Sequence, residues 1–290
     1  MQESIHIVEC PRDAMQGLKA FIPTKEKISY LNSLLEVGFN TLDFGSFVSP
    51  SAIPQMADTA LLLPELNLEK TGTKLLAIVA NVRGAREASM FEEISFLGFP
   101  FSISETFQKR NTNSTIDQSL HTVEQAWNIC EQNRKQLVIY LSMGFGNPYG
   151  DEWNSEIVLN WTARLVDMGI KIISLADTVG VANPKDISSL FSSLIPAFPQ
   201  IEFGAHFHTK PNAWKEKIDA AYMNGCRRFD GALKGYGGCP MADDKLTGNM
   251  PTENLVNFFR SKNFDLNLDE AQLGIALGEA DQLFSKYESH

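Results

Sequence analysis

The amino-acid sequence predicts an α/β protein whose strands close into a (β/α)8 TIM barrel, with an additional C-terminal helix. The chain of 290 residues alternates short apolar or β-branched runs with longer segments of helical period, and there are eight such runs. Repeated βα units build parallel sheets, and eight of them close most naturally into a barrel. No Gly-x-Gly-x-x-Gly follows the first run, which disfavours the main alternative, an open doubly wound sheet.

The predicted strands are short runs rich in apolar and β-branched residues, bounded by polar or turn-forming segments. In chain order they cover residues 5–9, 41–44, 74–80, 93–101, 137–142, 171–175, 201–207 and 227–233. The helices expected between and after these strands repeat their apolar residues with a helical period. They cover residues 25–37, 116–133, 155–168, 185–194, 213–224 and 268–287.

Glycine and proline mark several of the predicted helix boundaries. Gly38, Gly169 and Gly225 follow helical stretches, where glycine is common because it adopts the conformation that ends a helix. Pro184 and Pro251 lie next to helix starts, where the missing N–H of proline costs least. No linker, charge block or internal repeat divides the chain, so residues 1–290 are expected to form a single TIM-barrel catalytic domain, with 268–287 as a terminal helical extension.

Composition and charge narrow the possible classes of function. The formal net charge is -10, and a protein that neutralises phosphates needs a basic surface, so nucleic-acid binding is not expected. The N-terminus shows no secretory signal, and the apolar runs are far shorter than the ~20 residues that span a bilayer, so no membrane association is expected. The four cysteines are widely spaced without a CxxC pair, which fits reduced thiols. A cytoplasmic protein is therefore predicted.

A His-x-His pair, His206 and His208, lies at the end of the predicted seventh strand. Residues two apart in an extended chain project to the same side, so both imidazoles can face one ion. In a barrel the first strand closes beside the eighth, with the seventh next to it, which brings Asp13 and Asn249 to the same side of the mouth. A carboxylate, two imidazoles and an amide oxygen suit Mg2+ or Mn2+, although Zn2+ would compete for the histidines.

Each of these residues also has a structural explanation that the sequence alone leaves open. The two histidines can form a hydrogen-bonded polar pair on a strand face. Asp13 can be a helix N-cap or the partner of Arg12, and Asn249 can be a turn residue. Whether the four side chains hold an ion therefore depends on how closely the fold brings them together.

Several motifs spread over nearly the whole chain carry a resemblance to a known family. They are Pro11-Arg12-Asp13 with Gln16, residues 46–50 with 54–58, residues 174–181, His206-x-His208, and the segment Gly-Tyr-Gly-Gly-Cys-Pro at 235–240. Together they resemble the 3-hydroxy-3-methylglutaryl-CoA lyases, within the larger family of metal-dependent TIM-barrel lyases and Claisen-type synthases. The glycine-rich loop with Cys239 is the most specific motif, because it resembles the lyases rather than the synthases.

The resemblance implies a divalent-metal-dependent cleavage of 3-hydroxy-3-methylglutaryl-CoA to acetyl-CoA and acetoacetate, or of a closely related 3-hydroxyacyl-CoA to acetyl-CoA and a keto acid. Either His206 or Asp13 would take the hydroxyl proton, and Arg12 would stabilise the enolate that forms when the carbon–carbon bond breaks. Cys239 would protonate the enolate, although a lone cysteine is often just a small buried hydrophobe. Asp43 and Asp177 match acidic positions of the family.

Asp43 and Asp177 would position Arg12 or the substrate hydroxyl. Otherwise they would be solvated carboxylates at strand ends. The sequence also departs from the family at Cys10, Ala14 and Thr209, and one extra residue separates Cys239 from Asn249. These departures spare the ligand set but affect the entrance, so the exact acyl-CoA substrate stays open.

The alternatives are a Claisen-type synthase or keto-acid aldolase on the same barrel, or a catalytically silent metal-binding paralogue. A homodimer is possible.

Overall fold

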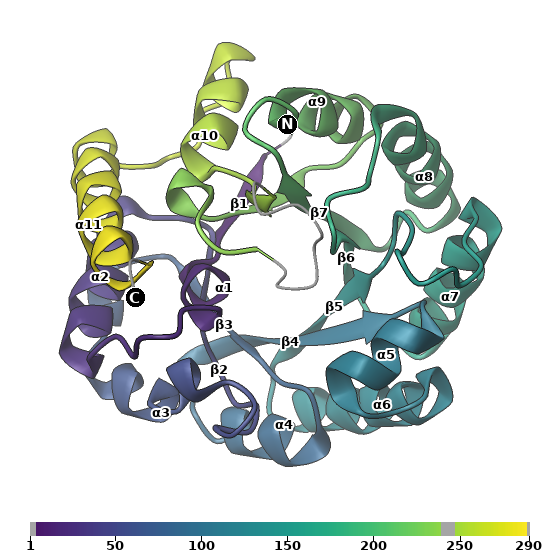
Figure 1. Ribbon diagram of the computed structural model, residues 1–290, viewed down its shortest axis with the longest axis horizontal. Helices are drawn as coiled ribbons and strands as arrows, with labels where there is room; N and C mark the ends of the chain where they lie inside the picture. Colours follow the sequence, from purple (N-terminus) through teal and green to yellow (C-terminus); the bar gives the residue numbers. More distant parts are fainter. Residues whose placement is uncertain (1–3, 239–246, 289–290) are drawn as a thin grey trace.

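The computed structural model describes residues 4–238 and 247–288. Within these residues, eight parallel strands form a closed barrel surrounded by helices (Figure 1). The predicted TIM barrel is confirmed, and each predicted strand is present. The strands are β1 (His6–Glu9), β2 (Thr41–Ser46), β3 (Lys74–Ile78), β4 (Ile94–Ser102), β5 (Gln136–Ser142), β6 (Ile172–Asp177), β7 (Glu202–Thr209) and β8 (Arg228–Gly231).

The sheet closes on itself, so the fold is a barrel and not the open doubly wound sheet that was the alternative. Strand β1 pairs in parallel with β2 on one side and with β8 on the other, and β6 pairs with β7. Along the β1–β8 ladder His6 lies opposite Arg228 and Glu9 opposite Gly231. Strands β1, β8 and β7 are consequently neighbours, as the sequence predicted, so residues that follow them meet at one part of the barrel mouth.

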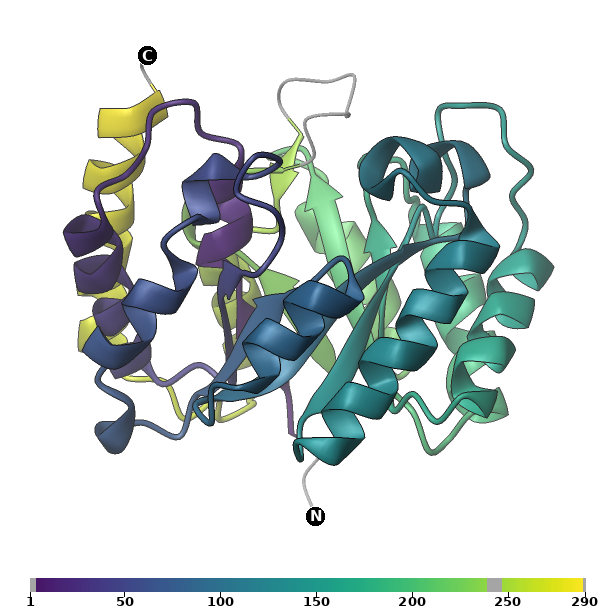
Figure 2. The same cartoon turned by 90° about the horizontal axis from the view of Figure 1, so that it is seen from below.

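Helices cover the outside of the barrel, as the two perpendicular views show (Figures 1 and 2). Local sequence sets several of their ends: Asn81 caps the start of one helix by accepting a hydrogen bond from the Gly84 N–H, and Gly38 ends another with φ 85°. The α-helices of the described residues are α1 (Pro11–Gln16), α2 (Thr24–Val37), α3 (Thr59–Leu62), α4 (Val82–Ser89), α5 (Glu105–Thr112), α6 (Ile116–Gln132), α7 (Ser155–Asp167), α8 (Pro184–Ala197), α9 (Trp214–Met223), α10 (Thr252–Ser261) and α11 (Glu270–Glu288).

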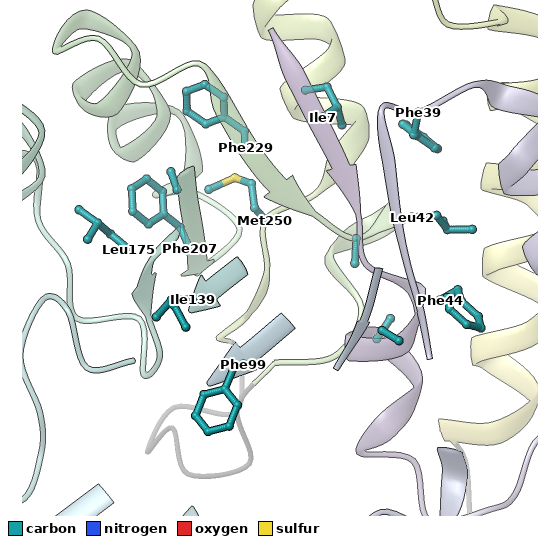
Figure 3. Close-up of a cluster of buried hydrophobic side chains, with 14 of the residues drawn as sticks. Ile7, Phe39, Leu42, Phe44, Phe99, Ile139, Leu175, Phe207, Phe229 and Met250 are labelled. Carbon is teal, nitrogen blue, oxygen red and sulfur yellow. The ribbon is translucent and has the colours of Figure 1, made fainter. Parts of the chain in front are cut away.

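The strands divide their side chains between two environments. Outward-facing residues such as Ile7, Leu42 and Phe207 are buried against the helices in the main hydrophobic core (Figure 3). A second, smaller cluster fills the barrel interior on the side of β3 to β6, and it consists of Leu76, Ile78, Val138, Tyr140 and Ile172. The interior on the side of β1, β2, β7 and β8 instead holds polar side chains. The alternation along each strand thus sends one set of side chains to the helices and the other set into the barrel interior.

The structure adds elements that the sequence did not predict and confirms the terminal helix. Helices α1, α4 and α5 have at most eight residues each, which is too few turns to show a clear period. A further strand, β9 (Gly248–Asn249), pairs antiparallel with β7. The predicted helix 268–287 is present as α11, which packs against α2. No helix of the described residues is both long and apolar enough to cross a membrane.

Candidate metal centre

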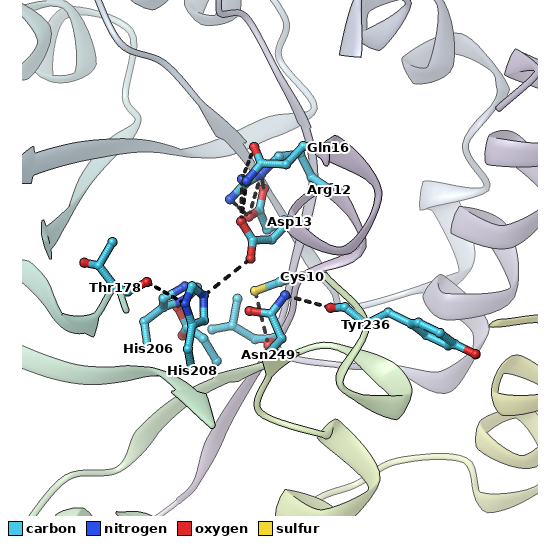
Figure 4. Close-up of polar contacts among 12 residues, drawn as sticks. Cys10, Arg12, Asp13, Gln16, Thr178, His206, His208, Tyr236 and Asn249 are labelled. Atoms are coloured by element: carbon cyan, nitrogen blue, oxygen red, sulfur yellow. Dashed lines mark hydrogen bonds and ion pairs between the residues drawn. The ribbon is translucent and has the colours of Figure 1, made fainter. Parts of the chain in front are cut away.

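The side chains of Asp13, His206 and His208 converge at the carboxyl ends of the strands (Figure 4). Asp13 lies in the first turn of α1, which follows β1 after a single residue, and the two histidines are both on the inner face of β7. One potential ligand atom from each residue lies within 4.8 Å of the other two. The fold therefore assembles three of the four predicted metal ligands in one place.

The geometry of His208 shows that this cluster suits a cation. Its Nδ1 atom lies 2.8 Å from the backbone carbonyl oxygen of Thr178, which only accepts, so Nδ1 carries the proton. In the neutral ring Nε2 is then an acceptor, and it faces Asp13 Oδ2 at 3.9 Å. Both atoms are buried and neither has a hydrogen-bond partner within the described residues. A cation placed between two such acceptors would satisfy both of them, and a divalent ion is one candidate.

Asn249 is brought to the same place by β9. Its Cα lies opposite that of His208 in the antiparallel pairing of β9 with β7, so the extra residue after Cys239 does not move it away from the cluster. The amide nitrogen of Asn249 donates to the carbonyl oxygen of Tyr236 at 2.8 Å. This bond fixes the amide orientation, and Figure 4 shows the amide oxygen on the side of the histidines. Asn249 is consequently part of a strand and not the turn residue that was the alternative.

His206 is supported by an aspartate that the sequence analysis did not single out. Its Nδ1 atom lies 3.1 Å from Oδ2 of Asp230 on β8, and both side chains are largely buried. Burial disfavours the imidazolium, but the hydrogen bond and charge of Asp230 outweigh it and raise the pKa of His206. Cys10 also lies close to His206 and Asp230, but burial raises the pKa of its thiol well above the usual range. The Cys10 thiol is directed to the backbone carbonyl oxygen of Val8 at 3.7 Å, whereas the cluster with Asp13 leaves two buried acceptors without a partner in the described residues, so the cluster with Asp13 is the better candidate.

Arg12 is held rigidly between two carboxylates beside this cluster. Its Nε and Nη2 atoms both donate to Asp43, and Nη1 donates to Asp13 Oδ1 at 2.8 Å and to Gln16 Oε1 at 2.9 Å. Burial lowers the pKa of a guanidinium, but the charges of Asp43 and Asp13 outweigh it, so Arg12 stays charged. Arg12 has five N–H groups, and among the described residues these bonds leave one of the two on Nη2 available to a ligand.

The two aspartates that contact Arg12 respond differently to their surroundings. Burial raises the pKa of Asp43 to about 6 against the effect of Arg12, so this side chain is ionised at neutral pH. Burial also opposes ionisation of Asp13, but Arg12 and the nearby histidines outweigh it and hold its pKa well below the usual range. Asp43 is completely buried and is not the solvated carboxylate that was the alternative. Its position makes it the residue that orients the guanidinium.

Asp177 is separate from the cluster, and its carboxylate forms an ion pair with a buried lysine. Lys217 on α9 donates to Asp177 Oδ2 at 2.6 Å and to the carbonyl oxygens of His208 and Gly180 at 2.9 and 3.2 Å. The other carboxylate oxygen accepts from the Ala182 N–H at 3.0 Å. Asp177 is therefore neither solvated nor aimed at Arg12. It holds the turn after β6 and, through Lys217, the end of β7 that carries His208.

Glu9, at the end of β1, connects the two ends of the segment that contains the glycine-rich loop. One carboxylate oxygen accepts from the Leu233 N–H at 2.9 Å, before the loop, and the other accepts from the Thr252 hydroxyl, after it. The side chain is fully buried, and burial raises the pKa of Glu9 to about 8.

Cys239, the predicted acid in this loop, lies outside the described residues. The sequence analysis missed Glu9 and Asp230, although a charged residue inside a predicted strand was a usable signal, and it missed Lys217, which lies in the predicted helix 213–224 without such a signal.

A cavity of about 400 Å3 opens at the mouth of the barrel above the cluster. Its lining includes Arg12, Asp13, His206 and His208, apolar side chains such as Val48, Ile78 and Phe107, and the polar side chains of Asn111, Thr112, Tyr140 and Ser142. The fold and this site together define a TIM-barrel protein with a candidate metal centre at the carboxyl ends of its strands, where such barrels carry their active sites. A sequence model of the HMGL-like family matches residues 5–276, and the chain belongs to that family.

Individual proteins support the same assignment. The chain is 33% identical over 262 residues to a hydroxymethylglutaryl-CoA lyase of Bacillus subtilis, covering 89% of this chain and 85% of that one. It is 31% identical to a cytoplasmic 3-hydroxy-3-methylglutaryl-CoA lyase of Rattus norvegicus, covering 93% of this chain and 78% of that one. The crystal structure of the lyase from Brucella melitensis has a TM-score of 0.90 at 28% identity, covering 97% and 99% of the two chains.

A further solved structure was determined with small molecules bound. It is a 3-hydroxy-3-methylglutaryl-CoA lyase from Acinetobacter baumannii in complex with coenzyme A and 3-methylmalate. Its TM-score to this chain is 0.89 at 29% identity, covering 97% of this chain and 93% of that one. The family resemblance that the sequence motifs indicated is thereby confirmed, and the chain is a carbon–carbon lyase by family.

Proposed function

We propose that this chain cleaves 3-hydroxy-3-methylglutaryl-CoA to acetyl-CoA and acetoacetate, or a closely related 3-hydroxyacyl-CoA to acetyl-CoA and the corresponding keto acid, in a divalent-metal-dependent retro-Claisen reaction. One observation carries the proposal: two buried acceptors, Asp13 Oδ2 and His208 Nε2, face each other 3.9 Å apart without a partner in the described residues. They lie beside a fixed guanidinium at the mouth of a cavity. This combination provides a place for an ion and a positive charge for a developing anion.

The ion of the proposal is Mg2+ or Mn2+, with Zn2+ also compatible with the histidines. Asp13, His206, His208 and Asn249 would hold it, because these side chains meet at the ends of β1, β7 and β9. When bound, a divalent ion supplies Lewis acidity, which lowers the pKa of a coordinated hydroxyl. The protein contributes the fixed geometry, through the Thr178 carbonyl behind His208 and the Tyr236 carbonyl behind Asn249.

Arg12 would stabilise the charge that appears when the carbon–carbon bond breaks. The electron pair of that bond passes to the acetyl-CoA fragment, which becomes a thioester enolate, while the hydroxyl carbon becomes the ketone of acetoacetate. A guanidinium already oriented by Asp43 and Asp13 needs no rearrangement to meet this charge. The remaining Nη2 proton and the charge of Arg12 are the groups that would face the enolate oxygen.

Two proton transfers complete the proposed reaction. The hydroxyl proton would pass to His206 or Asp13, and Cys239 would deliver a proton to the enolate carbon. His206 is paired through Nδ1 with Asp230, so only Nε2 remains for an ion or a proton. His206→Gln separates these roles: a ligand role predicts weaker Mn2+ binding, whereas a base role predicts a lower kcat with Mn2+ affinity unchanged.

The proposed reaction is tested with purified protein, 3-hydroxy-3-methylglutaryl-CoA and Mg2+ or Mn2+, with acetyl-CoA and acetoacetate measured as products. Product should form with metal and disappear on chelation. No product from a protein that demonstrably binds the ion would reject this substrate. Cys239→Ser should strongly reduce turnover while Mn2+ affinity stays intact, and equal turnover would remove the proposed acid role.

The cellular location and the assembly state complete the proposal. A cytoplasmic location is supported by the printed name of the rat relative, although a bovine relative is named as mitochondrial. A homodimer is proposed from the extra helix α11, which offers a surface beyond the barrel units. Light scattering of the purified chain decides the assembly state, because a dimer has twice the 32.3 kDa mass of the chain.

A further inference from the structure

The terminal helix α11 contacts the segment 233–238, which follows β8 in the chain and precedes β9. The ring of Tyr236 stacks on the ring of Phe284 of α11, with the centroids 4.3 Å apart and the planes 17° from parallel. The Tyr236 hydroxyl donates to Asp281 Oδ1 at 3.3 Å, and Lys234 Nζ donates to Asp281 Oδ2 at 2.8 Å. Two residues of one helix therefore hold the side chains of this segment.

Helix α11 is itself fixed to the barrel through α2. Phe284 is fully buried, and it also contacts the Tyr30 ring of α2 edge to face, with the centroids 6.1 Å apart. Near the end of α11, the Tyr287 hydroxyl donates to Glu26 of α2 at 3.0 Å. A buried side chain packed on two sides has little freedom to move. Phe284 consequently offers Tyr236 a rigid surface.

The backbone of the segment 233–238 provides little stiffness of its own. All three of its glycines have a positive φ, from 71° to 128°, and glycine restrains the chain least of all residues. Lys234 has a φ of 61°, which is unfavourable for a residue with a side chain. This conformation is supported by the bond from the Lys234 N–H to Glu253 at 2.9 Å and by the ion pair with Asp281. The side-chain contacts with α11 therefore supply restraint that the backbone lacks.

The carbonyl group of Tyr236 points in the opposite direction from its ring, toward the metal centre (Figure 4). It accepts a hydrogen bond from the Asn249 amide nitrogen at 2.8 Å, which leaves the amide oxygen on the side of the histidines. The two backbones also approach closely, because a Cβ atom at Gly237 would lie 3.0 Å from the same amide nitrogen. A shift of this segment would therefore turn the amide that is proposed to bind the ion.

We propose that Tyr236 is a positioning residue of the metal centre, which is held by α11 and acts through Asn249. The stack on Phe284 and the bond to Asp281 fix the Tyr236 carbonyl, and this carbonyl fixes the Asn249 amide oxygen toward the ion. The inference rests on the proposed metal-dependent function and adds a residue that is not itself a ligand. It also gives the terminal helix a role in the site.

The first experiment measures the Kd of Mn2+ by calorimetry in the absence of substrate. Tyr236→Ala should raise this Kd about tenfold, because loss of the group that orients a metal ligand typically weakens metal binding by that much. Tyr236→Phe keeps the stack on Phe284, so its Kd should stay within about twofold of the unaltered protein. A Kd of Tyr236→Ala that also lies within about twofold would overturn the inference.

The second experiment changes the helix side of the contact. Phe284→Leu removes the stack but keeps a buried apolar side chain, and it should raise the Kd of Mn2+ about fivefold. Asp281→Ala, at a half-exposed position that does not threaten the fold, should raise it about threefold. The matched control is Tyr287→Ala, because Tyr287 lies on the same helix but bonds to Glu26 of α2. Unchanged Mn2+ binding in both test variants, or an equal loss in the control, overturns the inference.

The third experiment combines Tyr236→Ala with Asn249→Ala. Because Tyr236 acts through Asn249, the second substitution should raise the Kd of the Asn249→Ala protein by less than about twofold. A further tenfold rise would show another route and overturn the inference. An unaltered protein without measurable Mn2+ binding rejects the proposed metal centre itself, whereas equal Mn2+ binding in the unaltered protein and all Tyr236 and α11 variants overturns this inference alone. Circular dichroism verifies that each variant is folded.

Discussion

The buried carboxyl group of Glu9 makes stability depend on pH in a predictable direction. Burial raises the pKa of Glu9 from 4.5 to about 8, so the folded protein keeps a proton that the unfolded chain releases. The contribution of protonated Glu9 to the free energy of unfolding is therefore fully present below pH 4.5, and it is lost as the pH rises through about 8. Between these values the free energy of unfolding should fall by about 1.4 kcal/mol per pH unit because of this one group.

The substitution Glu9→Gln removes the titrating group and keeps its shape. The amide oxygen can still accept from the Leu233 N–H, and the Thr252 hydroxyl can turn from donor to acceptor for the amide N–H2 group. The free energy of unfolding of Glu9→Gln should therefore not fall with pH in this way. The difference in unfolding free energy between the variant and the unaltered protein should reach about 5 kcal/mol over the full pH range between the two pKa values of Glu9. Glu9→Gln should exceed the unaltered protein in unfolding free energy at high pH, and this difference should vanish at low pH.

The assay is urea unfolding at pH 5.5, 6.5 and 7.5, followed by the fluorescence of the four tryptophans. The difference in unfolding free energy between Glu9→Gln and the unaltered protein should grow by about 1.4 kcal/mol per pH unit. Glu36→Gln, at an exposed position, is the matched control and should show no such change. Equal pH slopes for Glu9→Gln and the unaltered protein would refute the reasoning, because Glu9 would then titrate alike in both states.

Three further substitutions test the site. Arg12→Lys should lower kcat/KM by about a hundredfold with Mn2+ affinity unchanged, because the three N–H groups of an ammonium would all be taken by Asp43, Asp13 and Gln16 and none would remain for the enolate; activity within a factor of three would contradict this role. Asn249→Ala should weaken Mn2+ binding about tenfold or more by calorimetry, and an unchanged Kd removes it from the ligand set. Lys217→Met should destabilise the fold by about 3–5 kcal/mol in urea, because it leaves Asp177 buried and unpaired. Exposed Lys215→Met is its control, and equal stability of the two variants would show that the ion pair is dispensable.

Some features of the site were already contained in local sequence. The Pro-Arg-Asp segment and the His-x-His pair were identified because each places its side chains by local geometry: a turn at a strand end, and the two-residue repeat of a strand. The order of eight apolar runs similarly predicted the barrel, and the barrel predicted that Asp13 and the histidines would meet. Cys239 was identified by its glycine-rich motif, which is also a local signal.

Other features depend on contacts between distant segments. Asn249 joins β7 through a strand of two residues, and Asp230 reaches His206 across the β7–β8 pair. The lysine that pairs with Asp177 comes from α9, which lies 40 residues further along the chain. A charged residue in the sequence does not reveal its partner, because burial and pairing are set only when the helices and strands pack.

The sequence by itself determined the order of the elements, the barrel class and the residue types at the ends of the strands, because these follow from short-range periodicity and from motifs. The tertiary structure alone decided how deeply these side chains are buried and which atoms each of them contacts. Closure of β1 against β8 placed Asp13 beside the histidines, left Asp13 Oδ2 and His208 Nε2 facing each other, and turned Asp177 to Lys217 instead of Arg12. Side-chain distances and burial arise from packing between segments far apart in the chain, and no local pattern encodes them.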